Sequence, residues 1–387
     1  MTPACPLCNV AAAATFLLRE AVPVHQNLLV RTRAEARTVP RGRLAMTVCA
    51  GCGFVFNRAF DPALPRYGPD YDNTQSHSAA FDAYLAALAA HLVEERGVRG
   101  ARIVEIGSGK GDFLRRLIDW PGADNTGIGF DPAYAGPRED CAGRLRFESR
   151  LYGADCADVP ADVVICRHVI EHVADPLALL ADVRAALRGR PGARVFFETP
   201  DVAWILRHAV AWDFFYEHCS LFNAGSLASA FARAGFARVT VRHVFEGQYL
   251  WLEAEPGEAL PAMIRPSALP AWAAGYGRSE AARLALWRAR IAALAALGKV
   301  AVWGAGAKGV TFAGLADPDG EAIDCVVDIN PAKQGRYVPS TGHPIVAPSA
   351  LPGREVRHVI LMNPAYRAEV SALLPALGGA QLAEWDA

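Results

Sequence analysis

The chain has 387 residues, with 39 basic and 40 acidic side chains, a formal net charge of −1 and 52% hydrophobic residues. This length predicts two or three domains with substantial buried cores. The balanced charge argues against a general attraction to nucleic acid or anionic membranes, and we find no apolar run of membrane-spanning length and no signal-peptide core. We therefore expect a cytoplasmic monomer without a nucleic-acid or membrane partner.

Two C-x-x-C pairs mark residues 1–60, formed by Cys5 with Cys8 and by Cys49 with Cys52. Two such pairs complete a tetrahedral thiolate site, which predicts a structural zinc ion with no position left for water. Four unrelated cysteines or a redox dithiol are the alternatives, and a redox dithiol would leave the second pair unexplained. Residues 28–48 alternate loosely and predict short strands, so we expect a small β-rich zinc-binding module.

Residues 61–72 are rich in Pro, Gly and Tyr and predict a connector towards a helix at 79–96. Polar and aromatic side chains gather at this junction: Tyr67, Tyr71, Gln75, His77 and Ser78. Such a group is typical of a cleft between domains, although a solvated linker is an equal alternative for any one of them.

A strand–turn–helix–strand pattern begins at Ala101. The apolar stretch 101–106 leads into glycines at 107, 109 and 111, a helix at 111–119 and a second strand at 127–130. Glycines let the backbone turn sharply and approach a ligand closely, and the helix N-terminus favours an anionic group. Asp131 follows the second strand, 24 residues after Gly107, where an α/β nucleotide site needs a carboxylate for ribose hydroxyls.

The stretch from Val104 to Gly111, V-E-I-G-S-G-K-G, resembles the class I S-adenosylmethionine (SAM)-dependent methyltransferases. A plain dinucleotide-binding fold is the alternative. The resemblance implies that SAM is the cofactor. The residues implied in binding it are Glu105, Gly107, Ser108, Gly109, Gly111, Asp131, Pro132, Arg167 and His168.

Alternating strands and helices continue with a strand at 162–166, a helix at 176–187 and a strand at 194–198. We assign the methyltransferase core to residues 61–255. The run 167–173 follows the fourth strand, where strand ends border the ligand crevice of an α/β sheet. His168 and His172 are therefore placed to contact donor or substrate, with hydrogen bonding inside the loop as the alternative role.

The aromatic segment 214–222 contains Glu217 and His218 and follows the fifth strand. A neutral imidazole with an ordinary pKa of about 6.5 accepts a proton near pH 7, so His218 is a candidate general base. A nearby carboxylate would fix its tautomer and stabilise its charged form, although the adjacent Glu217 need not be that partner. The alternative is a buried histidine in an aromatic helix cap.

The last third, residues 256–387, predicts a Rossmann-like domain behind a helical linker at about 278–297. A strand leads into G-x-G-x-x-G at 304–309, and Asp328 ends the next strand. Taken alone this pattern predicts NAD binding. Lys308 and Lys333 are candidates to contact a substrate diphosphate or acid, with simple solvation as the equal alternative.

From Cys5 to about Tyr366, the chain resembles the sugar C-methyltransferases through its cysteine pairs, its glycine loop, its E-H-x-S-x-F segment and its last α/β domain. The resemblance implies SAM, a nucleotide-linked 4-keto deoxysugar, His218 as base, and a C-terminal domain that closes over the substrate without a redox cofactor. The family pattern Y-H-E-H reads Phe215-Tyr216-Glu217-His218 in this chain. Either Tyr216 or Tyr71 replaces the missing hydroxyl, or the substrate differs.

Three other functions stay open from the sequence. The first is a SAM-dependent methyltransferase for another small metabolite, acting at oxygen, nitrogen or carbon. The second is an NAD-dependent reductase that uses the C-terminal glycine motif. The third is a binding or scaffold protein built on the zinc module. It ranks last because it would leave Glu217, His218 and the first glycine loop without a role.

Overall fold

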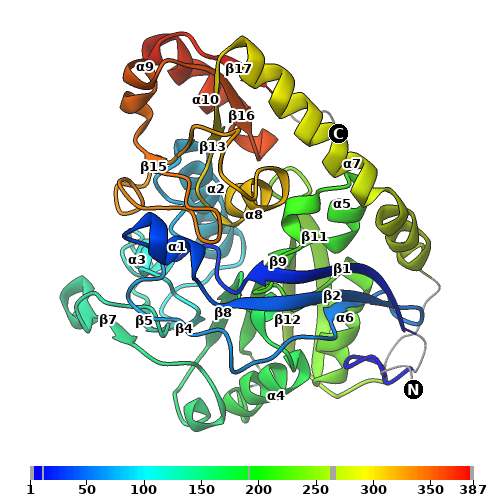
Figure 1. Cartoon of the computed structure of the whole chain (residues 1–387). Coiled ribbons are helices and arrows are strands. Elements are labelled where there is room, and N and C mark those ends of the chain that lie inside the picture. Colours follow the sequence, from blue (N-terminus) through cyan, green and yellow to red (C-terminus); the bar gives the residue numbers. More distant parts are fainter. Residues whose placement is uncertain (1–3, 11–12, 191, 262–266, 384–387) are drawn as a thin grey trace.

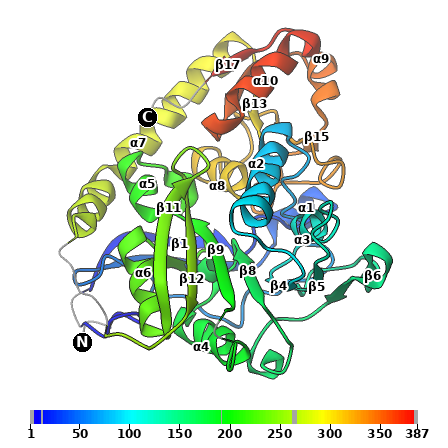
Figure 2. The same ribbon diagram turned by 180° about the vertical axis from the view of Figure 1, so that it is seen from behind.

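Three β-sheets with flanking helices form the protein (Figures 1 and 2). The computed structural model describes residues 4–10, 13–190, 192–261 and 267–383. The three sheets follow one another along the chain and define its first, central and last parts. One short strand of the first sheet comes from the central part of the chain. The α/β class expected from the sequence is confirmed.

The first sheet has four strands, and its last strand comes from the middle of the chain. Its order is β1 (Ala13–Pro23), β2 (Arg41–Cys49), β3 (Val55–Asn57) and β10 (Ser220–Leu221). Between β1 and β2, helix α1 (Arg33–Arg37) replaces part of the run of strands expected at 28–48. The reason is local: Thr32 and Glu35 form a reciprocal capping box that satisfies the helix N-terminus.

The central sheet has eight strands. Its order is β11 (Phe236–Val244), β12 (Tyr249–Pro256), β9 (Arg194–Pro200), β8 (Val163–Arg167), β4 (Arg102–Ile106), β5 (Thr126–Phe130), β7 (Leu145–Glu148) and β6 (Glu139–Asp140). The five strands from β9 to β7 are parallel, whereas β12 runs antiparallel beside β9. This arrangement is typical of class I methyltransferases.

Helices cover both faces of the central sheet (Figure 2). They are α2 (Ala79–Ala90), the π-helix η1 (His91–Glu95), α3 (Asp112–Ile118), α4 (Pro176–Ala186) and α6 (Ala224–Arg233). Helix α5 (Val202–Arg207) follows β9 and packs in a separate cluster with the first sheet. Alternate strand residues face opposite layers, as a side-chain period of two requires. Ile103 packs in the cluster with α2 and α3, whereas its neighbour Val104 packs in the cluster with α4 and α6.

Single-turn 3-10 helices occur in the connections of the central and last parts. They are η2 (Cys141–Gly143), η3 (Ala154–Cys156), η4 (Ile170–His172), η5 (Ala211–Asp213), η6 (Pro348–Ala350), η7 (Pro364–Tyr366) and η8 (Leu374–Leu377). Three of them, η4, η5 and η7, carry side chains of the site described below.

The last sheet is wholly parallel. Its order is β15 (Ile345–Val346), β14 (Cys325–Val327), β13 (Lys299–Trp303), β16 (Val356–Leu361) and β17 (Gln381–Ala383). Its helices are α7 (Leu269–Leu297), α8 (Ala307–Ala316), α9 (Leu351–Arg354) and α10 (Arg367–Leu373). Helix α7 begins before the 278 expected from the sequence. None of the described helices combines the length and apolar character that a bilayer crossing requires.

One buried apolar cluster joins all three parts. It includes Leu44 of β2, Trp212 of η5, Ile291 of α7 and Val302 of β13. Because these side chains share one core, the first and last sheets have fixed positions relative to the loops of the central sheet. The larger of the two cavities described below lies at that junction.

Candidate active site

The loop after β4 has the backbone shape that its three glycines predict. Gly107, Gly109 and Gly111 have φ values of 71°, 54° and 85°. A Cβ at Gly107 would lie 2.0 Å from Cγ2 of Val169, so no larger residue fits there, whereas a Cβ at Gly109 would point into open space. The loop therefore needs glycine for conformation at all three positions and leaves open space at Gly109.

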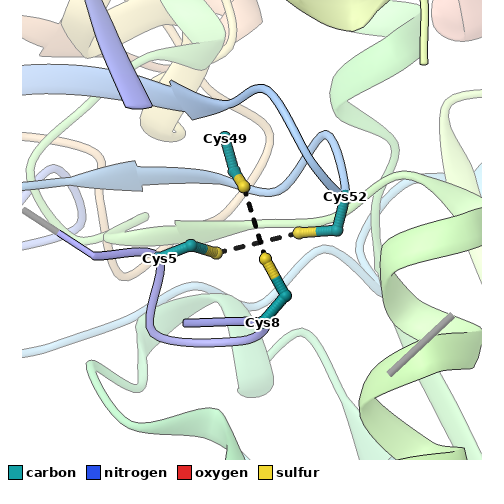
Figure 3. A group of neighbouring side chains, drawn as sticks. All are labelled: Cys5, Cys8, Cys49 and Cys52. Atoms are coloured by element: carbon teal, nitrogen blue, oxygen red, sulfur yellow. Dashed lines mark hydrogen bonds between the residues drawn. The ribbon is translucent and has the colours of Figure 1, made fainter. Parts of the chain in front are cut away.

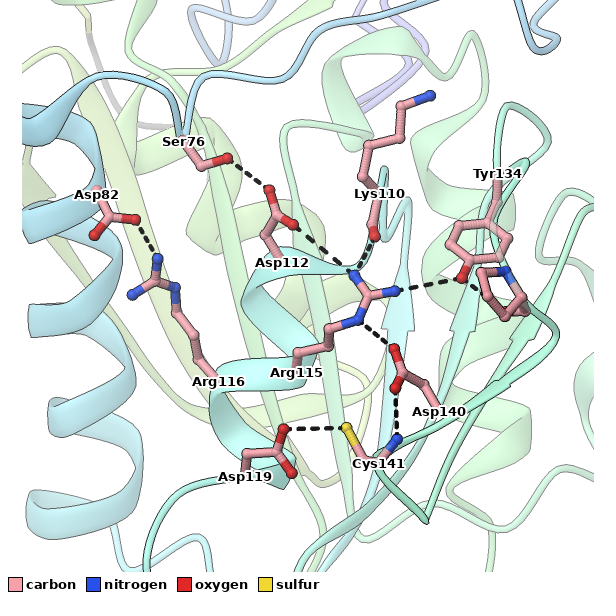
Figure 4. Close-up of polar contacts among 11 residues, drawn as sticks. Ser76, Asp82, Lys110, Asp112, Arg115, Arg116, Asp119, Tyr134, Asp140 and Cys141 are labelled. Atoms are coloured by element: carbon pink, nitrogen blue, oxygen red, sulfur yellow. Dashed lines mark hydrogen bonds and ion pairs between the residues drawn. The ribbon is translucent and has the colours of Figure 1, made fainter. Parts of the chain in front are cut away.

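Polar contacts brace this loop, and Figure 4 shows those around the first turn of α3. The backbone N–H of Gly109 donates to Oδ2 of Asp131 at 2.8 Å, and that of Ala133 donates to Oδ1 at 2.7 Å. Ser76 donates to Oδ2 of Asp112 at 2.6 Å, which ties the connector to the first turn of α3. Asp131 thus holds the loop, and both of its oxygens already accept backbone hydrogen bonds.

A cavity of about 100 Å³ lies over this loop, and we name it the loop cavity. Among the residues proposed from the sequence to bind the donor, those that line it are Glu105, Gly107, Ser108, Gly109, Arg167 and His168. Gly111, Asp131 and Pro132 are not on its lining. Oε2 of Glu105 and Oγ of Ser108 are buried without a hydrogen-bond partner. Burial raises the pKa of Glu105 to about 8.

A larger cavity of about 230 Å³, the central cavity, adjoins the loop cavity. Asn73, Thr74, Gln75 and His168 line both, so they form a shared wall. Side chains from all three parts of the fold reach the central cavity: Asn27 and Tyr71 from the first part, His172 and His218 from the central part, and Lys308 and Lys333 from the last.

His218 lies in the wall of the central cavity between other rings. Its ring centroid is 3.9 Å from that of Phe215 and 4.9 Å from that of His172. Its Nδ1 is buried without a hydrogen-bond partner. Burial, together with the positive charges of His172, His168 and Lys308, lowers the pKa of His218 well below its ordinary value. The imidazole is therefore neutral at pH 7 and able to accept a proton.

The expectation that Tyr216 brings a hydroxyl into the site is wrong. Its ring is fully buried, and its hydroxyl accepts a hydrogen bond from the backbone N–H of Asp61 at 2.8 Å. Successive side chains point in different directions here, so Phe215 faces the cavity and Tyr216 faces the first sheet. Tyr71 does line the central cavity.

Glu217 also points away from His218, and its partners lie in the first part of the chain. Oε1 is 3.0 Å from Nδ1 of His25, and Oε2 accepts the backbone N–H of Gln26 at 2.9 Å. Burial alone would raise the pKa of Glu217, but the hydrogen bonds from His25 and Gln26 and the charge of His172 hold it below its ordinary value. The carboxylate therefore anchors the segment to the first part of the fold.

His168 occupies the shared wall with a left-handed backbone, at φ 54°. Its Nδ1 is 3.4 Å from Oε1 of Glu171, and its Nε2 is 3.6 Å from Oε1 of Glu198. Burial lowers the pKa of His168, but Glu198 and Glu171 outweigh burial and raise it to about 9. Arg167 also donates to Glu198 at 2.7 Å. His168 is thus a cation held between carboxylates.

Sequence reasoning missed several lining residues, among them Glu171, Gln248 and Tyr249. Glu171 lies inside the 167–173 run that the sequence singles out, so its position after a strand was an available signal. No local pattern marks Gln248 and Tyr249, which reach the cavity because β12 pairs with β9. Gln248 donates to Oδ1 of Asn363 at 2.9 Å and so joins the central sheet to the last one.

The second glycine loop, 304–309, also lines the central cavity. The backbone N–H of Ala305 donates to Oδ2 of Asp328 at 2.7 Å, much as Gly109 does to Asp131. Lys333 is buried rather than solvated, and its Nζ donates to Oδ1 of Asn27 at 3.0 Å and to the carbonyl oxygen of Ala305 at 2.9 Å. Lys308 forms an ion pair with Asp213.

The four cysteines of the two C-x-x-C pairs converge on one point (Figure 3). Their sulfurs all lie within 4.8 Å of one another, with Cys5 Sγ 3.7 Å from Cys52 Sγ and Cys8 Sγ 3.5 Å from Cys49 Sγ. Zinc–sulfur bonds of about 2.3 Å at tetrahedral angles place sulfurs roughly 3.8 Å apart, close to these values. The donor set therefore fits a tetrahedral metal ion.

Two protein-family models match this chain, and both describe parts of methyltransferases. A methyltransferase-domain family model matches residues 78–241, and a C-methyltransferase C-terminal-domain model matches residues 274–381. No curated protein matches the chain.

Three solved structures are similar to part of the chain. An N1-methyltransferase of Burkholderia thailandensis with bound 1,6-didemethyltoxoflavin and S-adenosylhomocysteine is 18% identical over 47% of this chain and 80% of that one, with a TM-score of 0.34. The CurJ carbon methyltransferase is 16% identical over 47% and 56%, with a TM-score of 0.37. Human N-acetylserotonin methyltransferase with SAM is 14% identical over 45% and 55%, with a TM-score of 0.33.

The central sheet and the first family model define the class of protein, a methyltransferase of the class I fold. The chain is a SAM-dependent methyltransferase that also carries a C-methyltransferase C-terminal domain.

Proposed function

We propose that this enzyme methylates the carbon next to the ketone of a nucleotide-linked 4-keto deoxysugar, with His218 as general base. The observation that carries the proposal is the arrangement of the two cavities: His218 lines the larger one, and the glycine loop lines the adjoining one. Methyl transfer requires donor and acceptor sites that adjoin, and carbon methylation also requires a base beside the acceptor.

Residues of the loop cavity fit SAM. Open space at Gly109 admits close approach to the backbone, and the unpartnered oxygens of Glu105 and Ser108 can hydrogen-bond a polar ligand. We propose that Gly107, Arg167 and His168 complete this site and that Asp131 shapes it by bracing Gly109. When bound there, SAM supplies an electrophilic methyl group.

His218 is the group best placed to remove a proton from the acceptor. A base must be unprotonated, and the lowered pKa of His218 ensures that state at neutral pH. The low pKa also makes the imidazole a weak base, so the enolate formed needs stabilisation. Tyr71 and Lys333, which both line the cavity, carry hydroxyl and ammonium donors suited to an enolate oxygen.

Two features support a nucleotide diphosphate on the acceptor. The N-terminus of α8, at Ala307, opens onto the central cavity, and such a terminus favours anions. Lys308 lies beside it and carries a positive charge that Asp213 partly offsets. A sugar linked to a diphosphate would thus have its anionic part towards the last sheet and its ketone towards His218.

Phe215 supports a second candidate, a methyl acceptor other than such a sugar. It lines the cavity where the sugar C-methyltransferase pattern has a tyrosine, so one hydroxyl is absent beside His218. A small metabolite with a different carbonyl or heteroatom would suit this wall. If the methylated atom of such a metabolite is a carbon, the reaction is still a SAM-dependent C-methylation.

We also propose that Cys5, Cys8, Cys49 and Cys52 bind one structural zinc ion. The four thiols lie close together, and three of them are buried. With four sulfur ligands no position remains for water, so the ion acts on folding rather than on the reaction.

Mass spectrometry of candidate acceptors incubated with SAM tests the function. A nucleotide-linked 4-keto deoxysugar should gain one methyl group, on the carbon next to the ketone. Methylation at an oxygen or nitrogen, or methylation of unrelated metabolites only, would contradict the substrate and the role of the base.

A further inference from the structure

A cluster of three potential metal ligands lies in the wall of the central cavity, separate from the cysteine site. Glu171, His172 and His218 each offer a ligand atom, and these atoms lie within 4.8 Å of one another. Two imidazoles and one carboxylate are a common ligand set for zinc and related transition metals. Small side-chain rotations bring such atoms onto one ion with bonds of about 2.0–2.2 Å.

Two side chains of this cluster have an atom that lacks the partner which buried polar atoms normally have. Oε1 of Glu171 and Nδ1 of His218 are buried without a hydrogen bond, and Glu171 is 0% exposed. A buried carboxylate oxygen without a hydrogen bond costs free energy unless something else meets it. His168 lies 3.4 Å from the same oxygen and offers an ionic contact that a bound cation would displace or weaken.

The surrounding contacts orient the ligands as metal sites require. Nδ1 of His172 lies 3.0 Å from the hydroxyl of Tyr67, which leaves Nε2 for a metal. Oε2 of Glu171 accepts the hydroxyl of Thr199 at 3.1 Å, which leaves Oε1 towards the cluster. Outer partners of this kind fix the tautomer of a ligating histidine and the orientation of a ligating carboxylate.

We propose that Glu171, His172 and His218 form a second metal site, for a divalent transition metal such as Zn²⁺, that is inhibitory. Three protein ligands leave a fourth position open to the central cavity, where water or a substrate oxygen would bind. A metal bound to His218 takes the lone pair that the proposed function uses for the proton. The site exists whatever the acceptor is, because it depends only on this cluster.

Metal titration of the protein with its cysteine site already loaded tests the site without an activity readout. Calorimetry with Zn²⁺ and absorption spectra with Co²⁺ should show a second equivalent in nitrogen and oxygen ligands, distinct from the thiolate site. His172→Ala and Glu171→Gln should each weaken this second equivalent at least 10-fold, and Tyr67→Phe should weaken it by about 10–100-fold.

His77→Ala is the matched control, since His77 lines the same cavity outside the cluster. It should leave the second equivalent unchanged, and S-adenosylhomocysteine binding should report correct folding of every variant. If His172→Ala fails that check, His218→Gln replaces it. A wild-type protein that binds one equivalent only, or a second equivalent that survives loss of His172 or His218, overturns the proposal.

Activity data separate this proposal from the proposed function. With a turnover assay in hand, added Zn²⁺ should inhibit and a chelator should restore turnover while the cysteine-bound metal stays in place. Undiminished turnover at a Zn²⁺ concentration that fills the second equivalent contradicts the inhibitory role. If His218→Ala loses methylation in the absence of added metal, the loss supports His218 as the general base and says nothing of the metal site.

Discussion

Charged neighbours decide the protonation state of single residues in the central cavity. His168 is held as a cation by Glu171 and Glu198, and that cation is one of the charges that lower the pKa of His218. The two histidines thus have opposite shifts although both lie in the same wall. The carboxylates around His168 keep that imidazole charged, whereas the imidazole of His218 stays neutral and can act as a base.

The pH dependence of turnover follows from the shift of His218. The base acts unprotonated, and its pKa in the folded enzyme lies below 6.5. At saturating donor, kcat/KM for the acceptor reports the groups of the enzyme before the acceptor binds, so it should stay level as the pH falls to 6.5 and decline only below it. Stopped assays between pH 5 and pH 8 measure this profile, and an acidic decline centred at or above pH 6.5 would contradict the assignment.

The direction of Glu217 shows where residue-level reasoning from sequence ends. Its position next to His218 was visible, but its partners, His25 and Gln26, lie nearly two hundred residues earlier. The same holds for Tyr216, whose hydroxyl meets the backbone of Asp61. Which of several adjacent polar residues faces a cavity depends on such long-range contacts.

At the level of elements, local patterns predicted the central sheet well. The strand at 101–106, the turn and the strand at 127–130 were all recoverable, because glycine spacing and apolar runs are local signals. Helix α1 was missed because its five residues are too few to show a period. The pairing of β10 with β3 was not predictable from local sequence.

The glycine loop gives a prediction with a matched control. Gly109→Val should abolish S-adenosylhomocysteine binding, because its side chain would enter the loop cavity and strain a positive φ. Gly97 also has a positive φ with nothing near its Cβ, yet it is not on the cavity lining. Gly97→Val should thus match the strain and keep binding. Calorimetry measures both, and undiminished binding by Gly109→Val would refute the assignment.

The cysteine site is linked to the segment that carries His218. The backbone N–H of Asn57 donates to the carbonyl of Cys219 at 2.9 Å, and Nδ2 of Asn223 donates to the carbonyl of Gly53 at 3.0 Å. These contacts join the residues around the second C-x-x-C pair to both sides of β10. Loss of the metal should therefore loosen the segment.

Cys49→Ser tests this link. Elemental analysis should find one zinc per chain in the wild type and little or none in the variant. Hydrogen exchange should become faster at residues 219–222, whereas the amides of β4 should change little because they lie in the central sheet. If the metal-free variant shows unchanged hydrogen exchange at 219–222, the metal does not stabilise the segment that carries His218.

For the molecule as a whole, the central cavity depends on all three sheets. Asn27, His218 and Lys333 are each within reach of it, although more than a hundred residues separate each from the next. The class of enzyme could be predicted from sequence because the glycine loop is local. The lining of the acceptor side could not, because it arises from packing of the first and last sheets against the central one.

Carbon methylation with His218 as base is tested most directly by comparing wild type with His218→Ala on a nucleotide-linked 4-keto deoxysugar. Mass spectrometry in deuterated water should show one methyl group on the α-carbon of the wild-type product. The variant should lose turnover by about 10²–10⁴-fold or more. It should bind S-adenosylhomocysteine normally, and it should also lose any α-hydrogen exchange that the wild type shows. A His218→Ala enzyme that methylates this carbon at near wild-type rate would contradict the account.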